Sequence, residues 1–408
     1  MRVTYLHQYF NTPQMPGDGR SFEMARRLAA NGHQVNLLTA FRDESGNRDW
    51  FETREAGINV HWLPVPYSNT MSYAERIQSF FRFAMRSARR ASQLEADVVF
   101  ATSTPLTIAL PGVRAARRIG APMVFEVRDL WPELPIAMGV LRDPVSKFLA
   151  RRLERFAYRN SSRIVALSPG MAKGVAATGY PRERISVIPN SCDLELLEQS
   201  DEAAEAFRQS HPELGDGPIV LYAGTLGHIN GVDYLVEVAA RLLEASPSVR
   251  FVILGYGARE AHVRSEAERL GVLNRNLFIY SRIPKSEMVK AFSAASIATS
   301  LFVDLPEMEN NSANKFFDGL AAGKPVAINY GGWQAELLEE NDAGLVLSRD
   351  PNEAANQLDD CLGDPDWLDR TGRAARALAE QRFSRDRLAA KLEQVLLDAV
   401  DQPESGAT

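Results

Sequence analysis

The sequence predicts an α/β protein built from two doubly wound parallel sheets, one in each half of the chain. Short apolar segments alternate with amphipathic, helix-like segments through most of the 408 residues. Glycine-bearing loops follow several of the apolar segments, as expected at the carboxyl ends of parallel strands. A prior of about 150 residues per domain favours two or three domains over one.

The first series of strands and helices begins at the amino terminus. Residues 1–10 are expected to form a strand, followed by a glycine-bearing loop and an amphipathic helix that ends at Gly32. The same alternation predicts helices at 107–119 and 145–160, and strands at 35–39, 60–65, 96–102, 123–127 and 163–167.

A second series begins at Pro218. The acidic, loosely periodic segment 194–216 before it is expected to be the passage between domains. Strands are predicted at 219–224, 249–257, 277–283, 296–301, 324–331 and 343–347. The predicted domains are 1–195 and 196–384, and the amphipathic helix 385–400 is expected to pack back on the first. Two such domains imply a cleft between them, where ligand sites concentrate.

Composition excludes several classes of protein. No apolar run reaches the roughly 18 to 20 residues of a membrane span, and no signal peptide precedes the first strand, so a cytoplasmic location is expected. Cys192 and Cys361 are the two cysteines, too few for a disulfide framework and without the spacing of a zinc site. Neither a metal nor another cofactor is expected, and nucleic acid is not an expected partner.

The charge is unevenly distributed along the chain. Residues 1–195 carry a net charge of about +8, and the remainder carries about −14. Much of the positive excess lies in 147–159 and in 73–93, where Arg76, Arg82, Arg86, Arg89 and Arg90 alternate with Phe80, Phe81 and Phe83. A basic helix with exposed aromatic side chains suits an anionic membrane surface. The alternative is a helix whose Phe side chains face the core and whose Arg side chains are solvated.

The segment 310–328, NNSANKFFDGLAAGKPVAI, carries the strongest functional signal. It joins a polar loop, a helix and an apolar strand, and the start of a helix offers N–H groups to a phosphate-bearing ligand. Lys315 adds a cation in the first turn, and Asp318, one turn further on, can accept hydrogen bonds from ribose hydroxyls. The segment therefore predicts a nucleotide-diphosphate subsite at the carboxyl edge of a parallel sheet.

Three glycine-bearing loops add to this subsite. Gly17 and Gly19 follow the first strand, but a third glycine and a terminal acidic residue on the second strand are missing, which disfavours a dinucleotide-binding dehydrogenase. In the second half, Gly224, Thr225 and Gly227 follow one strand, and Gly255, Tyr256 and Gly257 follow the next. Each loop alone could be a plain turn. Together with 310–318 they predict one concave site for phosphate and sugar.

Charged residues are unusually dense in 125–135, FEVRDLWPELP. Glu126, Arg128, Asp129 and Glu133 surround Trp131 at the end of a buried strand. We interpret them as an acceptor and leaving-group site; the alternative is an internal ion pair covered by tryptophan. The six histidines are scattered, with His33 expected to be structural, and Asp364-Pro365-Asp366 is expected to be a turn rather than a metal site.

These segments resemble a known family. PGDGRSFEMARRLAANGHQV, VIPNSCD, LYAGTLG, VILGYG and NKFFDGLAAGKPVAI look like the retaining, family 4 glycosyltransferases with the GT-B fold. The resemblance spans nearly the whole chain. Within this family, the motifs RDLWPE and NKFFD are similar to those of bacterial transferases that build O-antigen, capsule and exopolysaccharide repeat units, including fucosaminyltransferase-like members.

The resemblance implies a role for each segment. The Gly17–Gly19 loop would abut the donor diphosphate, Ile283 would contact the nucleobase, and Asp318 would replace the second glutamate of the family's E-x7-E motif. Asn310 stands at the first glutamate's place, so Asn311, Ser312, Ala313, Asn314 and Lys315 would matter more for the sugar and phosphates. Ile229-Asn230 stands where many relatives carry an Arg and a Lys, and Lys315 and Arg282 would compensate. Arg128 stands where many relatives carry His, which leaves Asp129 to orient the acceptor hydroxyl.

The function that the resemblance implies is transfer of a sugar, with retention and without a metal, from a UDP-sugar to a lipid-linked saccharide at the inner face of the cytoplasmic membrane. Such an enzyme stabilises the departing diphosphate and positions the acceptor, which needs no strong nucleophile. The alternatives are a nucleotide-sugar epimerase of the same fold and a non-catalytic nucleotide-sugar-binding protein.

Overall fold

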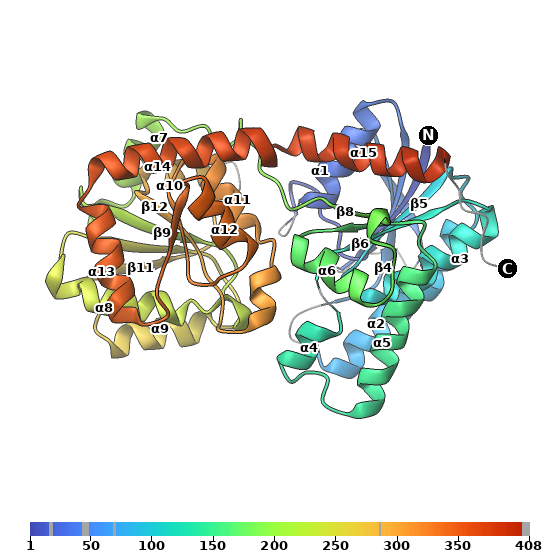
Figure 1. The fold of residues 1–408 in the computed structure, drawn as a ribbon, viewed down its shortest axis with the longest axis horizontal. Coiled ribbons are helices and arrows are strands. Elements are labelled where there is room, and N and C mark those ends of the chain that lie inside the picture. Colours follow the sequence, from blue (N-terminus) through green and yellow to red (C-terminus); the bar gives the residue numbers. More distant parts are fainter. Residues whose placement is uncertain (16–18, 43–48, 68–70, 130, 285–286, 402–408) are drawn as a thin grey trace. The chain divides into compact units, whose positions relative to one another are not determined.

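The computed structural model describes residues 1–15, 19–42, 49–67, 71–129, 131–284 and 287–401. The chain forms two compact units, and each is described by itself (Figure 1). The first contains Met1–Pro189 together with Arg385–Thr408, and the second contains Asn190–Ser384. The units part between Pro189 and Asn190, where the sequence predicted a boundary at 195/196.

The first unit is built on an eight-stranded sheet in the order β3-β4-β2-β1-β5-β6-β7-β8. β3 is antiparallel to β4, and the other neighbours are parallel. The strands are β1 Arg2–Leu6, β2 Gln34–Phe41, β3 Phe51–Glu55, β4 Ile58–Pro64, β5 Val98–Thr102, β6 Met123–Val127, β7 Arg163–Ala166 and β8 Ile185–Val187. β3 and β8 are additions to the predicted strands. β3 (FETRE) has neither an apolar run nor an apolar–polar alternation, and β8 has only three residues, so both lack a strand signal.

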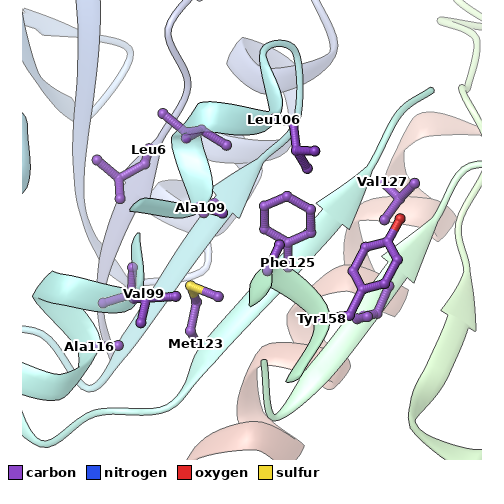
Figure 2. Close-up of a cluster of buried hydrophobic side chains, with 14 of the residues drawn as sticks. Leu6, Val99, Leu106, Ala109, Ala116, Met123, Phe125, Val127 and Tyr158 are labelled. Atoms are coloured by element: carbon purple, nitrogen blue, oxygen red, sulfur yellow. The ribbon is translucent and has the colours of Figure 1, made fainter. Parts of the chain in front are cut away.

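Helices pack on both faces of this sheet. α2 (Tyr73–Ala91), α3 (Ala109–Ile119), α5 (Pro144–Arg159) and α6 (Pro169–Ala177) share one core cluster with the strands. Figure 2 shows part of it, with Ala116 of α3 and Tyr158 of α5 beside Met123 and Phe125 of β6. α4 (Glu133–Ala137) is a short helix before α5. Side-chain caps start the helices: Ser72 and Glu75 form a capping box on α2, and Asp143 caps α5 ahead of Pro144.

The last helix of the chain, α15 (Arg385–Asp401), packs on α1 (Arg20–Ala30) of the first unit. Nε of Arg27 lies 2.5 Å from Oδ1 of Asp386. Nε2 of His33 lies 2.6 Å from Oε1 of Glu393, so His33 contributes to packing at this place. The amphipathic pattern of 385–400 therefore corresponds to a helix that buries Leu388, Leu392 and Leu396.

The second unit is built on a six-stranded, fully parallel sheet in the order β11-β10-β9-β12-β13-β14. All six predicted strands are present: β9 Ile219–Ala223, β10 Arg250–Leu254, β11 Leu277–Tyr280, β12 Ile297–Ser300, β13 Val326–Ile328 and β14 Gly344–Val346. The helices are α7 Asp201–Ser210, α8 Asp233–Ala245, α9 Glu260–Arg269, α10 Met288–Ala294, α11 Asn314–Ala321, α12 Trp333–Glu340, α13 Pro351–Leu362 and α14 Pro365–Leu378.

The structure tests two local predictions for this unit, one for the segment 194–216 and one for Asp364-Pro365-Asp366. The segment 194–216 is not simply a passage between domains, because it contains α7, which packs on α10 and buries Phe207. The helix was not predicted because the segment is mostly acidic and polar, and Phe207 is the only residue of α7 that is buried. Asp364 is the N-cap of α14: its side chain accepts a hydrogen bond from the N–H of Trp367 at 2.9 Å, with Pro365 in the first turn.

Candidate functional site

Loops at the carboxyl edge of the second sheet bring several predicted donor-binding residues together. Gly224 follows β9, Gly255 follows β10, and Arg282 and Ile283 follow β11. The N–H of Gly224 donates to the carbonyl of Leu254 at 3.0 Å, and the N–H of Gly255 donates to the carbonyl of Tyr280 at 3.2 Å. These bonds continue the strand ladder into the loops and hold the three segments side by side.

Two of the glycines are required by close backbone packing. A Cβ atom on Gly255 would lie 1.9 Å from the carbonyl oxygen of Gly224, and one on Gly257 would lie 2.4 Å from that of Leu226. Both distances are far below any tolerated contact, so a side chain would push the loops apart. Gly255 and Gly257 therefore shape the site by allowing the backbones to meet.

The turn after β9 is closed by Asn230. Its side-chain oxygen accepts a hydrogen bond from the N–H of Gly227 at 3.1 Å, and a Cβ on Gly227 would lie 2.9 Å from that oxygen. Asn230 is buried, and Gly231 follows it in the left-handed conformation, with φ of 55°. Asn230 therefore stabilises the loop that carries Thr225 and Gly227, and it brings no charge.

Tyr256 and Arg282 form an exposed pair beside these loops. The Tyr256 ring is 51% exposed, which is unusual for a large hydrophobic side chain in this unit. The Arg282 guanidinium carbon lies 5.8 Å from the centre of that ring. The pair offers an aromatic face and a cation to a ligand, and neighbouring Ile283 is partly buried.

Lys315 is the most unusual charged residue of the site. It occupies the first turn of α11 and is buried, with its Nζ 4.4 Å from the centre of the Phe302 ring and 5.1 Å from that of Tyr222. Nζ donates a long hydrogen bond of 3.5 Å to the Tyr222 hydroxyl. The Lys315 chain also lies close to Gly224, since a Cβ there would be 3.5 Å from Cδ of Lys315.

Burial changes the ionisation of Lys315. Among the residues that the structure describes, no carboxylate lies within salt-bridge distance of its Nζ. Loss of solvation without a counter-charge lowers the pKa of Lys315 to about 7. Burial also raises the pKa of the Tyr222 hydroxyl, so that group stays neutral. An anion placed beside Nζ would restore the charge of this lysine.

The loop before α11 is held by its own polar side chains. The side-chain oxygen of Asn311 accepts from the N–H of Ala313 at 3.1 Å, and the backbone carbonyl of Asn311 accepts from Nε1 of Trp333 at 2.8 Å. Oγ of Ser312 accepts from the N–H of Asn190 at 3.0 Å. Ala313 is the N-cap residue and offers no side-chain acceptor to the first turn of the helix. Asn311 and Ser312 therefore hold the loop, while the start of α11 suits an anion.

Asn314 and Asp318 are partly exposed and lie one turn apart on α11, so they share a face of that helix. Asn310 ends the short helical turn Pro306–Asn310 and is also partly exposed. Gly17 lies outside the described residues. Gly19 is the N-cap of α1 and a Cβ there meets nothing within 4 Å, so packing does not require glycine at this position.

In the first unit, the carboxyl ends of β1, β5 and β6 bring three segments together. The N–H of Arg128 donates to Oγ of Ser103 at 2.9 Å, and its Nη1 lies 3.4 Å from Nε2 of His7. The Thr104 hydroxyl donates to Oδ2 of Asp129 at 3.2 Å. Burial raises the pKa of Asp129, although Arg128 and the Thr104 hydroxyl oppose the shift.

Glu126 does not belong to this group. Its Oε1 lies 2.8 Å from Nη2 of Arg20, and both side chains are almost fully buried. Arg20 also donates to the carbonyls of Ile188 and Pro189. For Glu126 the internal ion pair is therefore correct, and the assignment to an acceptor site is wrong. Glu133 lies 3.8 Å from Arg151 on α5, and Trp131 packs on the core cluster of the unit.

Sequence reasoning missed His7, Tyr222 and Phe302. His7 immediately follows β1 and is buried beside Arg128, at the same sheet edge as Asp129. The rings of Tyr222 and Phe302 both lie close to Nζ of Lys315. His7 and Phe302 come just after predicted strands, and this position could have marked them as candidate site residues. Tyr222 lies inside the apolar strand β9, where the sequence predicts a core residue.

The basic helix α2 shows features of both interpretations. Phe83 is fully buried, and Arg86 and Arg90 lie beside Asp49 and Glu52. A second row, Ile77, Phe81 and Met85, is exposed at helical spacing. Further exposed apolar side chains lie between α4 and the first half of α5: Met138, Val140, Val145, Phe148 and Leu149. We call these eight residues the apolar surface. The two helices that carry most of them, α2 and α5, both contact Leu106–Ile108.

No helix in the described part of the chain is long and apolar enough to cross a bilayer.

Two α/β units on largely parallel sheets, with glycine loops and a helix start at the carboxyl edge of the second sheet, are the architecture of the GT-B fold. Solved structures agree. The "Crystal structure of Anabaena Alr3699/HepE in complex with UDP" superposes with a TM-score of 0.74 at 17% identity, covering 98% of this chain and 100% of that one. The "Crystal Structure of WaaG, a glycosyltransferase involved in lipopolysaccharide biosynthesis" superposes with a TM-score of 0.73 at 16% identity, covering 97% and 99%.

Sequence comparison identifies the family. Residues 20–191 match the family described as "Glycosyl transferase 4-like domain", and residues 203–378 match "Glycosyl transferases group 1". The chain is 25% identical to the "Putative colanic acid biosynthesis glycosyl transferase WcaI" of Escherichia coli (strain K12), over 65% of this chain and 69% of that protein. It is 26% identical to the "D-inositol 3-phosphate glycosyltransferase" of Xylanimonas cellulosilytica, over 98% and 97%.

The chain belongs to the family 4 glycosyltransferases. The predicted fold class, family and enzyme class are confirmed. The predicted site residues, the absence of a cofactor and the acceptor stay predictions.

Proposed function

We propose that this glycosyltransferase moves a sugar from a UDP-sugar to a lipid-linked saccharide, with retention of configuration and without a metal or other cofactor, during synthesis of a surface polysaccharide. The bond between the anomeric carbon and the diphosphate breaks, and the diphosphate leaves with the electron pair. The acceptor hydroxyl forms the new glycosidic bond and gives up its proton. The protein's main task is to stabilise the charge on the leaving diphosphate.

Lys315 is the observation that carries the donor side of the proposal. A buried lysine with a lowered pKa and, within the described ranges of the chain, no carboxylate partner is costly for the empty protein. A diphosphate beside Gly224 and the start of α11 would supply the missing negative charge. We assign the ribose to Asp318 and the nucleobase to Ile283 and the exposed Tyr256 ring.

Asp129 is the proposed partner of the acceptor hydroxyl. Its raised pKa keeps it a stronger proton acceptor than an ordinary aspartate, and the Thr104 hydroxyl, which donates a hydrogen bond to it, holds it in place. Arg128 would contribute positive charge. The uridine nucleotide is supported by the UDP of the HepE structure; a relative in Mycobacterium tuberculosis, 26% identical, is named a GDP-mannose-dependent alpha-mannosyltransferase, which makes the nucleobase an experimental question.

A transfer assay with purified full-length protein tests this function. UDP-, GDP- and ADP-sugars would be supplied with a lipid-linked saccharide acceptor, and the anomeric configuration of the product would be read by NMR. We expect product with a UDP-sugar, lost in Lys315→Met and Asp318→Ala. Lys324→Met is the matched control, because Lys324 is also partly buried but bonds to the carbonyl of Ser293. Conversion of the donor to its epimer without acceptor, or no binding of any donor, would refute the proposal.

The apolar surface supports a membrane-bound acceptor. Eight exposed apolar side chains accompany basic residues that include Arg82, Arg89 and Lys147, the combination that binds anionic bilayers. We therefore place the enzyme at the inner face of the cytoplasmic membrane. Flotation with anionic liposomes should be lost in Phe81→Ser/Met85→Ser and weakened in Arg82→Glu/Arg89→Glu. Arg241→Glu/Arg275→Glu in the second unit is the charge-matched control, and equal loss in that variant would contradict a specific surface.

A further inference from the structure

Thr104 has an unusual backbone conformation for its residue type. It lies two residues after the end of β5, and its φ angle is 86°, in the region that glycine favours. In the part of the chain that the structure describes, the other non-glycine residues with positive φ are Ala56, Asn274 and Asp342, at 46°, 57° and 50°. Those angles lie near the left-handed helical minimum, which Asn and Asp tolerate. A side chain branched at Cβ is strained at 86°.

Contacts on both sides of Thr104 hold the chain in this conformation. The N–H of Ser103 donates to the carbonyl of Glu126 at 2.8 Å, and its Oγ accepts from the N–H of Arg128 at 2.9 Å. These bonds join the end of β5 to the end of β6. After Thr104, Leu106 is buried in the core cluster of the first unit. The surroundings therefore fix the backbone at Thr104 although its conformation is unfavourable.

The side chain of Thr104 makes a contact that glycine could not make. Its hydroxyl donates a hydrogen bond to Oδ2 of Asp129 at 3.2 Å. Glycine would adopt the same φ without strain, but it carries no hydroxyl. A turn with a structural role alone would therefore favour glycine at this position. The strain accompanies a hydrogen bond to the residue that we assign to the acceptor hydroxyl.

The groups around Asp129 act on its ionisation in opposite directions. Burial raises the pKa of Asp129, and the charge of Arg128 and the hydrogen bond from Thr104 both lower it. Nη1 of Arg128 also lies 3.4 Å from Nε2 of His7. Because the Thr104 hydroxyl stabilises the carboxylate, removing that hydroxyl should raise the pKa of Asp129 further. The hydrogen bond to Oδ2 also restricts the rotation of the carboxylate.

We propose that Thr104 is a positioning residue for sugar transfer, whose hydroxyl orients the Asp129 carboxylate toward the acceptor at a cost in backbone strain. This inference rests on the proposed function through the role of Asp129. Thr104 itself forms no bond with the substrate, so its removal should lower kcat and leave donor binding unchanged. Because strain at a functional position costs stability, relieving it should change stability and activity in opposite directions.

Three substitutions of Thr104 in the full-length protein separate strain from hydrogen bonding. Thr104→Gly removes both, Thr104→Val removes the hydroxyl and keeps the branched Cβ, and Thr104→Ser keeps the hydroxyl. We expect kcat to fall at least about tenfold in the Gly and Val variants, as for loss of one charge-assisted hydrogen bond, and to stay near the wild type in Thr104→Ser. The Tm of Thr104→Gly should equal or exceed that of the wild type, and the Kd for UDP should be unchanged in all three.

Ala56→Gly is the matched control, because it also replaces an exposed non-glycine residue with positive φ in the first unit. It should not lower the Tm, and kcat should be unchanged. A lower Tm in Thr104→Gly, or a kcat in Thr104→Val equal to that of the wild type, would overturn the proposal. Absence of transfer by the wild type would refute the proposed function and this role with it, so the two failures can be told apart.

Carbon-13 NMR of the aspartate carboxyl groups gives a measurement that a merely structural role would not change. The spectrum of Asp129→Asn identifies the signal of Asp129, and its titration needs no sugar transfer. In Thr104→Val the Asp129 carboxyl should titrate about one pH unit higher than in the wild type, since one hydrogen bond to the charged form is lost. Thr104→Ser should restore the lower pKa. Equal titration curves in the wild type and in Thr104→Val would show that Thr104 does not hold this carboxylate.

Discussion

The ionisation of Lys315 should make donor binding consume a proton. In the empty protein its pKa is lowered to about 7 by burial. At pH 8 a group with this pKa is protonated in roughly one molecule in ten. A nucleoside diphosphate beside Nζ favours the charged form, so the pKa should rise well above 8. Binding of UDP at pH 8 should then take up about 0.9 proton.

Affinity should change with pH for the same reason. Above pH 7, protonating Lys315 costs about 1.4 kcal/mol per pH unit, so the Kd for UDP should rise about tenfold for each unit until the pKa of the complex is reached. The stability of the empty protein should depend on pH in the opposite direction to its affinity for UDP. Because the unfolded chain holds this proton up to its ordinary pKa and the folded chain releases it near 7, the free energy of unfolding should increase with pH above 7.

Calorimetry in buffers of different ionisation enthalpy measures the proton uptake directly. The control is Lys315→Arg, because a guanidinium stays protonated at pH 8 and should bind UDP with no uptake. Lys315→Met should bind UDP weakly and raise the free energy of unfolding of the empty protein by at least about 1 kcal/mol. Equal proton uptake in the wild type and in Lys315→Arg would show that the proton goes elsewhere and would refute the reasoning.

Three further predictions concern packing and pH. Glu126→Gln removes the carboxylate that pairs with Arg20, so it should lower the free energy of unfolding, measured by urea titration, by about 3–5 kcal/mol. The control Glu133→Gln changes an exposed ion pair and should alter the free energy of unfolding by less than about 1 kcal/mol. Similar values for the two variants would contradict a buried ion pair. Gly255→Ala should weaken UDP binding at least about tenfold by displacing Gly224, while Gly363→Ala at the end of α13 should leave it unchanged. The rate of transfer should fall as pH drops through the raised pKa of Asp129, and Asp129→Asn should be slow and lack this acidic limb; an unchanged pH profile would exclude Asp129 as the titrating group.

Much of the fold could be predicted because its signals are local. All six strands of the second sheet lie in the largely apolar segments of five to nine residues that the sequence predicted. β3 escaped prediction because an edge strand with exposed Glu52, Thr53 and Arg54 has no apolar pattern. α7 was taken for a passage because its acidic face dominates the composition and Phe207 alone is buried.

Some residues of the candidate site could likewise be predicted from local patterns, and others could not. Gly224, Gly255 and Lys315 could be named because each follows a strand or starts a helix, and parallel strands bring such positions to one edge. The pairing of Glu126 could not be predicted, because its partner Arg20 lies 106 residues away. His7 was passed over because nothing in its neighbours indicates that Arg128 ends beside it.

The order of strands and helices, the class of enzyme and the places where ligands are expected all follow from patterns a few residues long, which the chain carries before it folds. The lowered pKa of Lys315 and the buried pair of Glu126 with Arg20 arise only when distant segments pack together. Desolvation and charge pairing depend on the atoms within a few ångströms of a group. Those neighbours are brought there by tertiary contacts, such as the rings of Tyr222 and Phe302 around Nζ of Lys315.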